Sequence, residues 1–145
     1  GHPVTDVIIN KYVNIALEKN ISFESDFIYP KNLCMSALDL SVILNNALEN
    51  AIEACEKMPE GEKRYITLHS FCRENMFFVE VVNCFFGKLA YETDTADARI
   101  VTTKSEKEMH GFGLKNIESC AAKYYGRVEC SVQDGTFKLC VMLQK

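Results

Sequence analysis

The longest regular pattern in the chain is helical and runs from Ser36 to Lys57. Apolar residues recur there every three or four positions: Leu40, Leu44, Leu48, Ala51 and Cys55. At about 100° per residue they fall on one side of a helix, and that side has to be buried against another layer. Pro59 and Gly61 end the pattern. The segment predicts a long helix packed by one face on the rest of the domain.

Two pairs of alternating segments predict β-hairpins. Tyr65–Cys72 and Met76–Asn83 are joined by a three-residue link, which favours antiparallel pairing. Arg127–Gln133 and Thr136–Leu143 flank Asp134-Gly135, a dipeptide typical of a tight hairpin turn.

Three further segments complete the expected layout. They are helices at Pro3–Lys19, with Tyr12 among its apolar positions, and Phe112–Tyr125, and a strand at Ser22–Tyr29. The hairpins exclude a wholly parallel sheet. They favour an α+β fold in which a mixed sheet of about five strands is covered on one face by three helices.

Length and charge limit the classes of function. With 145 residues the chain has the size of one domain, expected over residues 3–145, and Gly1 and His2 are interpreted as a possible cloning scar. A net charge of −4 argues against nucleic acid as a partner. No apolar run reaches the roughly 20 residues of a membrane helix, so a soluble chain is expected, and its free cysteines favour a reducing cytosol. The seven cysteines contain no CxxC pair and are interpreted as free thiols that fill the core, with Cys34, Cys55 and Cys120 in helical stretches.

The face of the long helix opposite its apolar side is unusual in composition. It carries Asp39, Asn46, Glu49, Asn50 and Glu53. Asparagine costs about 0.6 kcal/mol relative to alanine inside a helix, yet it also occurs at position 45. The amides of Asn46 and Asn50 could ligate a hard cation, with Glu49 and Glu53 beside them. An ordinary solvated helix face is the alternative, and the residues alone leave both open.

A glycine pair opens the helix that follows a long polar segment, about residues 85–110, which we interpret as a lid. In His110-Gly111-Phe112-Gly113-Leu114 the glycines allow close approach of the backbone, and the free N–H groups of a helix start attract phosphate. Thr103 and Lys104 lie upstream and could contact the same anion. A Gly-x-Gly pair on its own often does no more than permit a turn.

Together these features resemble the GHKL family, which includes gyrase, Hsp90, histidine kinases and the MutL repair proteins. The residues that carry the resemblance are Asn50 within Asn-Ala-Ile-Glu-Ala, a strand that ends at Asn83, the polar lid and Gly-Phe-Gly-Leu. More narrowly, Leu44–Ala54 and Thr102–Ile117 look like the ATP-binding domain of peptide-sensing histidine kinases of the accessory gene regulator type. The resemblance implies a Bergerat-type two-layer α/β sandwich that binds ATP and Mg²⁺.

The resemblance also implies roles for individual residues. Asn50 is expected to coordinate Mg²⁺ between the phosphates, and the catalytic residues are expected to be Asn46, Glu49 and Asn50. The expected nucleotide contacts are Asn50, Glu53, Asn83, Thr103, Lys104, His110, Gly111, Gly113 and Leu114.

Two residues depart from the pattern of related kinases. Where those carry an Asp-x-Gly-x-Gly box, this chain has Asn83 at the position of the aspartate. Its amide oxygen can accept from the adenine amine, and its NH₂ could instead face guanine, so modest ATP affinity and a shallow preference over GTP are expected. Glu53 stands where related kinases often have lysine, which removes one cation facing the phosphates.

The implied activity is transfer of the ATP γ-phosphoryl group to a histidine on a dimerisation segment outside this chain. Neither His69 nor His110 has the sequence context of an acceptor. A response regulator would be an indirect partner, and a sensor region outside the chain would provide the only link to a membrane. The alternatives are an anti-sigma-type serine kinase and a pseudokinase module of the same fold that acts by docking to a partner.

Overall fold

The computed structural model describes residues 2–86 and 111–145. Its elements, in chain order, are α1 (Pro3–Glu18), β1 (Ser22–Asp26), α2 (Ala37–Glu56), β2 (Tyr65–Arg73), β3 (Met76–Cys84), α4 (Gly111–Ala122), β4 (Arg127–Gln133) and β5 (Thr136–Gln144). The described part of the chain thus holds three helices and five strands, and the predicted α+β class is confirmed.

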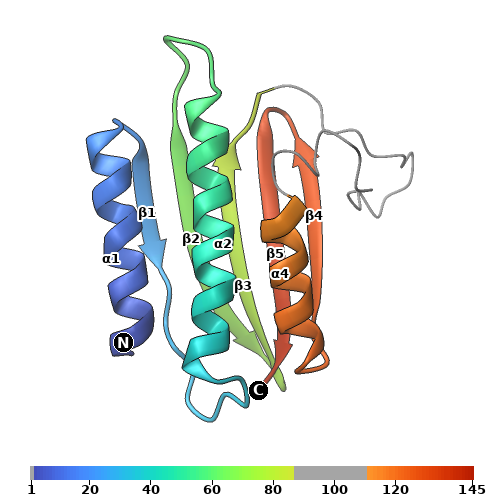
Figure 1. Cartoon of the computed structure of the whole chain (residues 1–145). Coiled ribbons are helices and arrows are strands. Elements are labelled where there is room, and N and C mark those ends of the chain that lie inside the picture. The colour runs from blue at the N-terminus through green and yellow to red at the C-terminus, as the bar shows by residue number, and fades with distance from the viewer. Residues whose placement is uncertain (1, 87–110) are drawn as a thin grey trace.

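The strands form one mixed sheet in the order β1-β2-β3-β5-β4. β1 runs parallel to β2, and the other neighbours are antiparallel. The helices form a single layer in front of the sheet, with α2 between α1 and α4 (Figure 1). Both predicted hairpins are present. Asp134 and Gly135 have φ angles of 51° and 75°, which matches the two positive φ values of a type I′ turn.

The core lies between the helices and the sheet. Every apolar residue predicted to share one face of α2 is at most 1% exposed. In β3 the alternate residues Phe77, Val79 and Val81 are 1–2% exposed, and α4 contributes Ile117 and Ala121 to the same core. The next residue in the β3 row is Asn83, which is 2% exposed. A polar side chain therefore continues an apolar row at the carboxyl end of this strand.

The first strand is shorter than the sequence predicts. β1 ends at Asp26, whereas the pattern predicted a strand to Tyr29. Beyond Asp26 the backbone N–H of Ile28 donates to the hydroxyl of Ser70 at 2.8 Å, so a side chain replaces the ladder bond. Pro30 follows, and it has no N–H to donate.

The end of α4 also differs from the sequence prediction, which extended the helix to Tyr125. The helix ends at Ala122, and the residue in the left-handed region is Tyr125, with φ 57°. The N–H of Gly126 donates to the carbonyl oxygen of Ala121 at 2.8 Å. A Cβ at position 126 would lie 2.3 Å from the carbonyl oxygen of Met142. Glycine is therefore required here by the close approach of β5.

The cysteines divide by burial. Four are buried, as expected for thiols that fill a core: Cys55, Cys84, Cys120 and Cys130. The Sγ atoms of Cys55 and Cys84 lie 3.3 Å from each other. The prediction was wrong for Cys34, which is exposed and precedes α2, and for the exposed Cys72. Within the described ranges no three His, Cys, Asp or Glu side chains gather as metal ligands. No helix there is long and apolar enough to cross a membrane.

Candidate functional site

Two asparagines of α2 face the first turn of α4. A Cβ placed on Gly113 would lie 3.1 Å from both Nδ2 and Oδ1 of Asn50 and 3.5 Å from Oδ1 of Asn46. α2 and α4 lie side by side in the helical layer (Figure 1). Residues that are more than 60 positions apart in the chain therefore lie close together, and the absence of a side chain at Gly113 makes room for the Asn50 amide.

The two amides differ in their freedom to bind a ligand. Asn46 Nδ2 donates to the carbonyl oxygen of Val42 at 2.7 Å, which ties the side chain to its own helix and leaves Oδ1 toward Gly113. No hydrogen bond joins the Asn50 amide to any other residue in the ranges 2–86 and 111–145. Asn50 therefore has the freer amide of the two.

The amino end of α4 adds a second kind of group. The helix begins at Gly111, and the first N–H groups of a helix have no partner inside it. Such a helix start binds anions because its N–H groups and its dipole both favour negative charge. Amide oxygens are typical ligands of hard divalent cations. A metal ion bound to a phosphate would suit both features, because the amide oxygens favour the cation and the helix start favours the phosphate.

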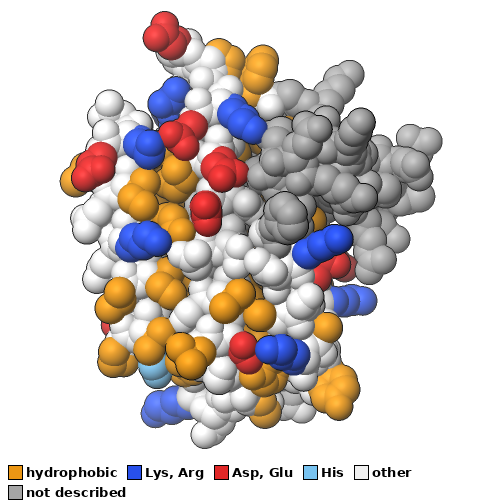
Figure 2. Space-filling model, in the orientation of Figure 1, with side chains coloured by type: hydrophobic (Ala, Val, Ile, Leu, Met, Phe, Trp, Pro, Cys, Tyr) orange, Lys and Arg blue, Asp and Glu red, His pale blue; other side chains and the backbone are white. Residues whose placement is uncertain are grey.

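The carboxylates of α2 act on a different neighbour. Glu49 and Glu53 help to raise the pKa of Tyr12, on α1, to about 12, although burial of the phenol is the larger cause. Burial also raises the pKa of Glu53, and Glu49 adds to that effect. Figure 2 shows acidic side chains gathered over the carboxyl-terminal half of α2. The amides of α2 thus face α4, while the carboxylates Glu49 and Glu53 raise the pKa of Tyr12 on α1.

Asn83 presents a buried acceptor toward the helical layer. Its Nδ2 donates to the carbonyl oxygen of Cys84 at 2.8 Å, and no described residue donates to its Oδ1. Because buried polar atoms are almost always hydrogen-bonded, such an atom suggests a ligand.

Of the remaining predicted contacts, Leu114 packs against the core. Thr103, Lys104 and His110, with nearly all of the predicted lid, lie outside the described residues.

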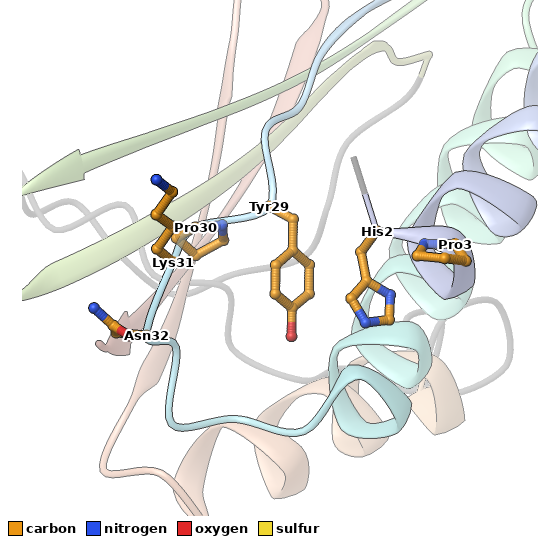
Figure 3. Close-up of a pocket in the computed structure, with 6 residues that line it drawn as sticks. All are labelled: His2, Pro3, Tyr29, Pro30, Lys31 and Asn32. Atoms are coloured by element: carbon orange, nitrogen blue, oxygen red, sulfur yellow. The ribbon is translucent and has the colours of Figure 1, made fainter.

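A cavity of about 520 Å³ lies elsewhere, between the start of α1 and the loop after β1 (Figure 3). It is lined by His2, Pro3, Tyr29, Pro30, Lys31 and Asn32, none of which is a predicted site residue. The ring of His2 stacks on Tyr29, with 4.6 Å between the ring centroids. Since His2 was interpreted as a possible scar, we assign this cavity no role.

Sequence reasoning missed two tyrosine contacts to α2. Tyr12 donates its hydroxyl to Oδ1 of Asn45 at 2.8 Å, and Tyr124 donates to Oδ2 of Asp39 at 2.5 Å. The Tyr124 bond is the main cause of a lowered pKa for Asp39. For Tyr12 a signal was available, because a tyrosine on the buried face of a helix needs a partner for its hydroxyl. Asn45, which had no predicted role, is that partner.

The architecture is shared with catalytic domains of histidine kinases. The catalytic domain of histidine kinase ThkA, nucleotide-free, is 21% identical, with a TM-score of 0.64 over 97% of this chain and 93% of that one. The mycobacterial sensor histidine kinase MprB is 15% identical, with a TM-score of 0.63 and coverage of 97% and 95%. Acinetobacter baumannii histidine kinase AdeS is 11% identical, with a TM-score of 0.69 over 97% of this chain and 62% of that one.

A family model described as GHKL domain matches residues 35–144, which is most of the chain. The chain therefore belongs to the GHKL family. The comparison with curated proteins gave no match. The narrower resemblance to kinases of the accessory gene regulator type stays a prediction.

Proposed function

We propose that this chain is the ATP-binding catalytic domain of a sensor histidine kinase and donates the γ-phosphoryl group to a histidine on a separate dimerisation segment. The observation that carries the proposal is the Asn50 amide, which has no partner among the described residues and lies against Gly113 in the first turn of α4. Membership of the GHKL family and the shared kinase fold support the same activity.

The residues present suit a magnesium–nucleotide complex. Asn50 would supply an oxygen ligand to Mg²⁺, with Oδ1 of Asn46 also directed toward Gly113, and the N–H groups at the start of α4 would bind phosphate oxygens. Glu49 is proposed as a catalytic residue from the sequence pattern alone. Bound Mg²⁺ would neutralise charge on the phosphates, and phosphoryl transfer depends mainly on positioning and charge neutralisation. We also propose Glu53, Thr103, Lys104 and His110 as contacts from the sequence pattern alone.

Asn83 is proposed to accept a hydrogen bond from the adenine amine. The bond from its Nδ2 to Cys84 holds the amide with Oδ1 as the free atom, which is the orientation that adenine needs. Turning NH₂ toward guanine would break that bond. We therefore expect stronger rejection of GTP than the sequence alone predicts.

Asn83→Asp should make the nucleotide-free chain less stable and ATP a better stabiliser. An aspartate cannot donate to Cys84, and its carboxylate would be buried, so we expect a loss of about 1 kcal/mol in the free energy of unfolding. The adenine amine restores a donor when ATP binds. Thermal melts with and without Mg·ATP should show a larger upward shift for the variant than for the parent chain. Equal shifts, with an unchanged ratio of ATP to GTP affinity, would contradict the adenine assignment.

The proposed transfer is tested by mixing the chain with Mg·ATP labelled at the γ-phosphate and a helical dimerisation segment that carries an acceptor histidine. We expect acid-labile label on the segment and none on the chain, and a segment without its histidine is the control. Acid-stable label on a serine of the supplied segment would instead indicate a serine kinase. ATP binding without any transfer would indicate a pseudokinase.

The cellular setting follows from the proposed function. We propose that the domain acts in the cytoplasm, that a response regulator receives the phosphoryl group from the histidine segment, and that any link to a membrane runs through a sensor region outside this chain.

A further inference from the structure

Tyr12 connects α1 to α2 beside the candidate site. Its side chain is 3% exposed, and its hydroxyl lies 2.8 Å from Oδ1 and 3.2 Å from the backbone oxygen of Asn45. Asn45 immediately precedes Asn46 and lies five residues before Asn50. The bond therefore joins α1 to the part of α2 that carries the two site amides.

The Tyr12 hydroxyl is a hydrogen-bond donor, because a tyrosine keeps its proton at neutral pH. Burial, together with the nearby charges of Glu49 and Glu53, raises its pKa further, to about 12. A buried hydroxyl needs an acceptor, and both the amide and the backbone oxygen of Asn45 are within reach. This also accounts for an asparagine at a helix position where it is otherwise unfavourable.

A directional bond at this point constrains how α2 is rotated about its axis. At the far end of the two helices Lys19, which caps α1, forms an exposed ion pair with Glu56 of α2 at 2.8 Å. The residues that α1 and α2 contribute to the core are apolar, and apolar burial has little directional preference. Adjacent residues of a helix are separated by about 100°, so fixing Asn45 toward α1 also fixes Asn46 and Asn50 toward α4. Magnesium demands nearly ideal octahedral geometry, so its binding is sensitive to a small rotation.

We propose that Tyr12 is a positioning residue for the metal-binding turn of α2, acting through Asn45. The inference rests on the proposed function, because it assigns Tyr12 to the same magnesium–nucleotide site. Tyr12 itself is not expected to touch the nucleotide.

The test compares two tyrosine variants. Tyr12→Phe keeps the ring and removes the bond to Asn45. Tyr124→Phe is a matched control, because it also removes a hydroxyl bond to α2, but at Asp39, two turns before Asn46. ATP affinity is measured by calorimetry with Mg²⁺ and again with a chelator, and the ratio of the two affinities gives the gain due to magnesium. Circular dichroism confirms the fold of each variant.

We expect Tyr12→Phe to reduce the magnesium-dependent gain by about three- to tenfold, the effect of one hydrogen bond, and to leave the affinity in chelator within about twofold. Tyr124→Phe should leave the gain unchanged even if it lowers the melting temperature. Asn45→Ala removes the nearer acceptor, at 2.8 Å, and leaves the backbone oxygen at 3.2 Å. It should therefore reduce the gain, though by no more than Tyr12→Phe does, and the double variant should lose no more than Tyr12→Phe alone.

Four outcomes overturn the inference. An unchanged gain in Tyr12→Phe, or an equal loss in Tyr124→Phe, would show that the tyrosine only stabilises the fold. Should Tyr12→Phe fail to fold, an unchanged gain in Asn45→Ala overturns the inference in the same way. If the parent chain binds no ATP, the proposed function fails and the inference fails with it.

Discussion

Asn50→Ala is expected to lower the affinity for Mg·ATP by about 100-fold or more. Replacing a residue that only hydrogen-bonds to a metal ligand typically lowers metal affinity by about 10- to 100-fold, and loss of the ligand itself should cost more. The fold should survive, since the Asn50 amide makes no hydrogen bond to another described residue. Alanine is also the better helix former by about 0.6 kcal/mol, so the free energy of unfolding should stay level or rise. Calorimetry and urea unfolding on the same sample measure both.

Asn14→Ala is the control for this variant. Asn14 is an exposed asparagine in α1, so its replacement changes helix propensity without touching the site. It should bind Mg·ATP like the parent chain. If Asn50→Ala also binds like the parent, then Asn50 is an ordinary surface residue and the site assignment is wrong.

Gly113→Ala is expected to lower the affinity for Mg·ATP by about tenfold or more, a loss on the scale of a disturbed metal ligand. Alanine normally stabilises a helix relative to glycine by up to about 1 kcal/mol. Here the new Cβ would stand 3.1 Å from both terminal atoms of the Asn50 amide, so that amide has to move. We expect binding to fall while the free energy of unfolding stays level or rises.

Gly126→Ala provides the contrasting case. Its Cβ would meet the carbonyl oxygen of Met142 at 2.3 Å, which is backbone and cannot move aside. That variant should lose about 1–3 kcal/mol of stability, as overpacked positions do. A Gly113→Ala chain that keeps the ATP affinity of the parent would show that Asn50 tolerates displacement and does not hold the metal.

The parts of the fold that the sequence predicted well depend on local periodicity. α2 begins one residue after Ser36 because the Ser36 side chain accepts the N–H of Asp39 at 3.1 Å, a capping signal visible in the sequence. The hairpin around Asp134-Gly135 is likewise decided by residues adjacent in the chain. The end of β1 depends instead on Ser70, more than 40 positions away, and no local pattern could reveal that contact.

The candidate site likewise contains features that a local motif predicts and features that depend on packing between distant segments. Asn50 and Gly113 were predicted from motifs, and the packing of α2 on α4 places them in contact. The bond between Tyr12 and Asn45 was not predicted, because it depends on how α1 is rotated against α2. The amide orientation of Asn83 was also out of reach, since it is set by the backbone oxygen of Cys84 at the end of the strand.

The central claim is that the Asn50 amide and the start of α4 bind ATP through Mg²⁺. Calorimetric titration of the parent chain with ATP, once with Mg²⁺ and once with a chelator, tests this most directly. We expect one ATP bound per chain with Mg²⁺ and a loss of most of that affinity when the metal is removed. Absence of ATP binding in both titrations, or equal affinity in the two, would contradict the claim.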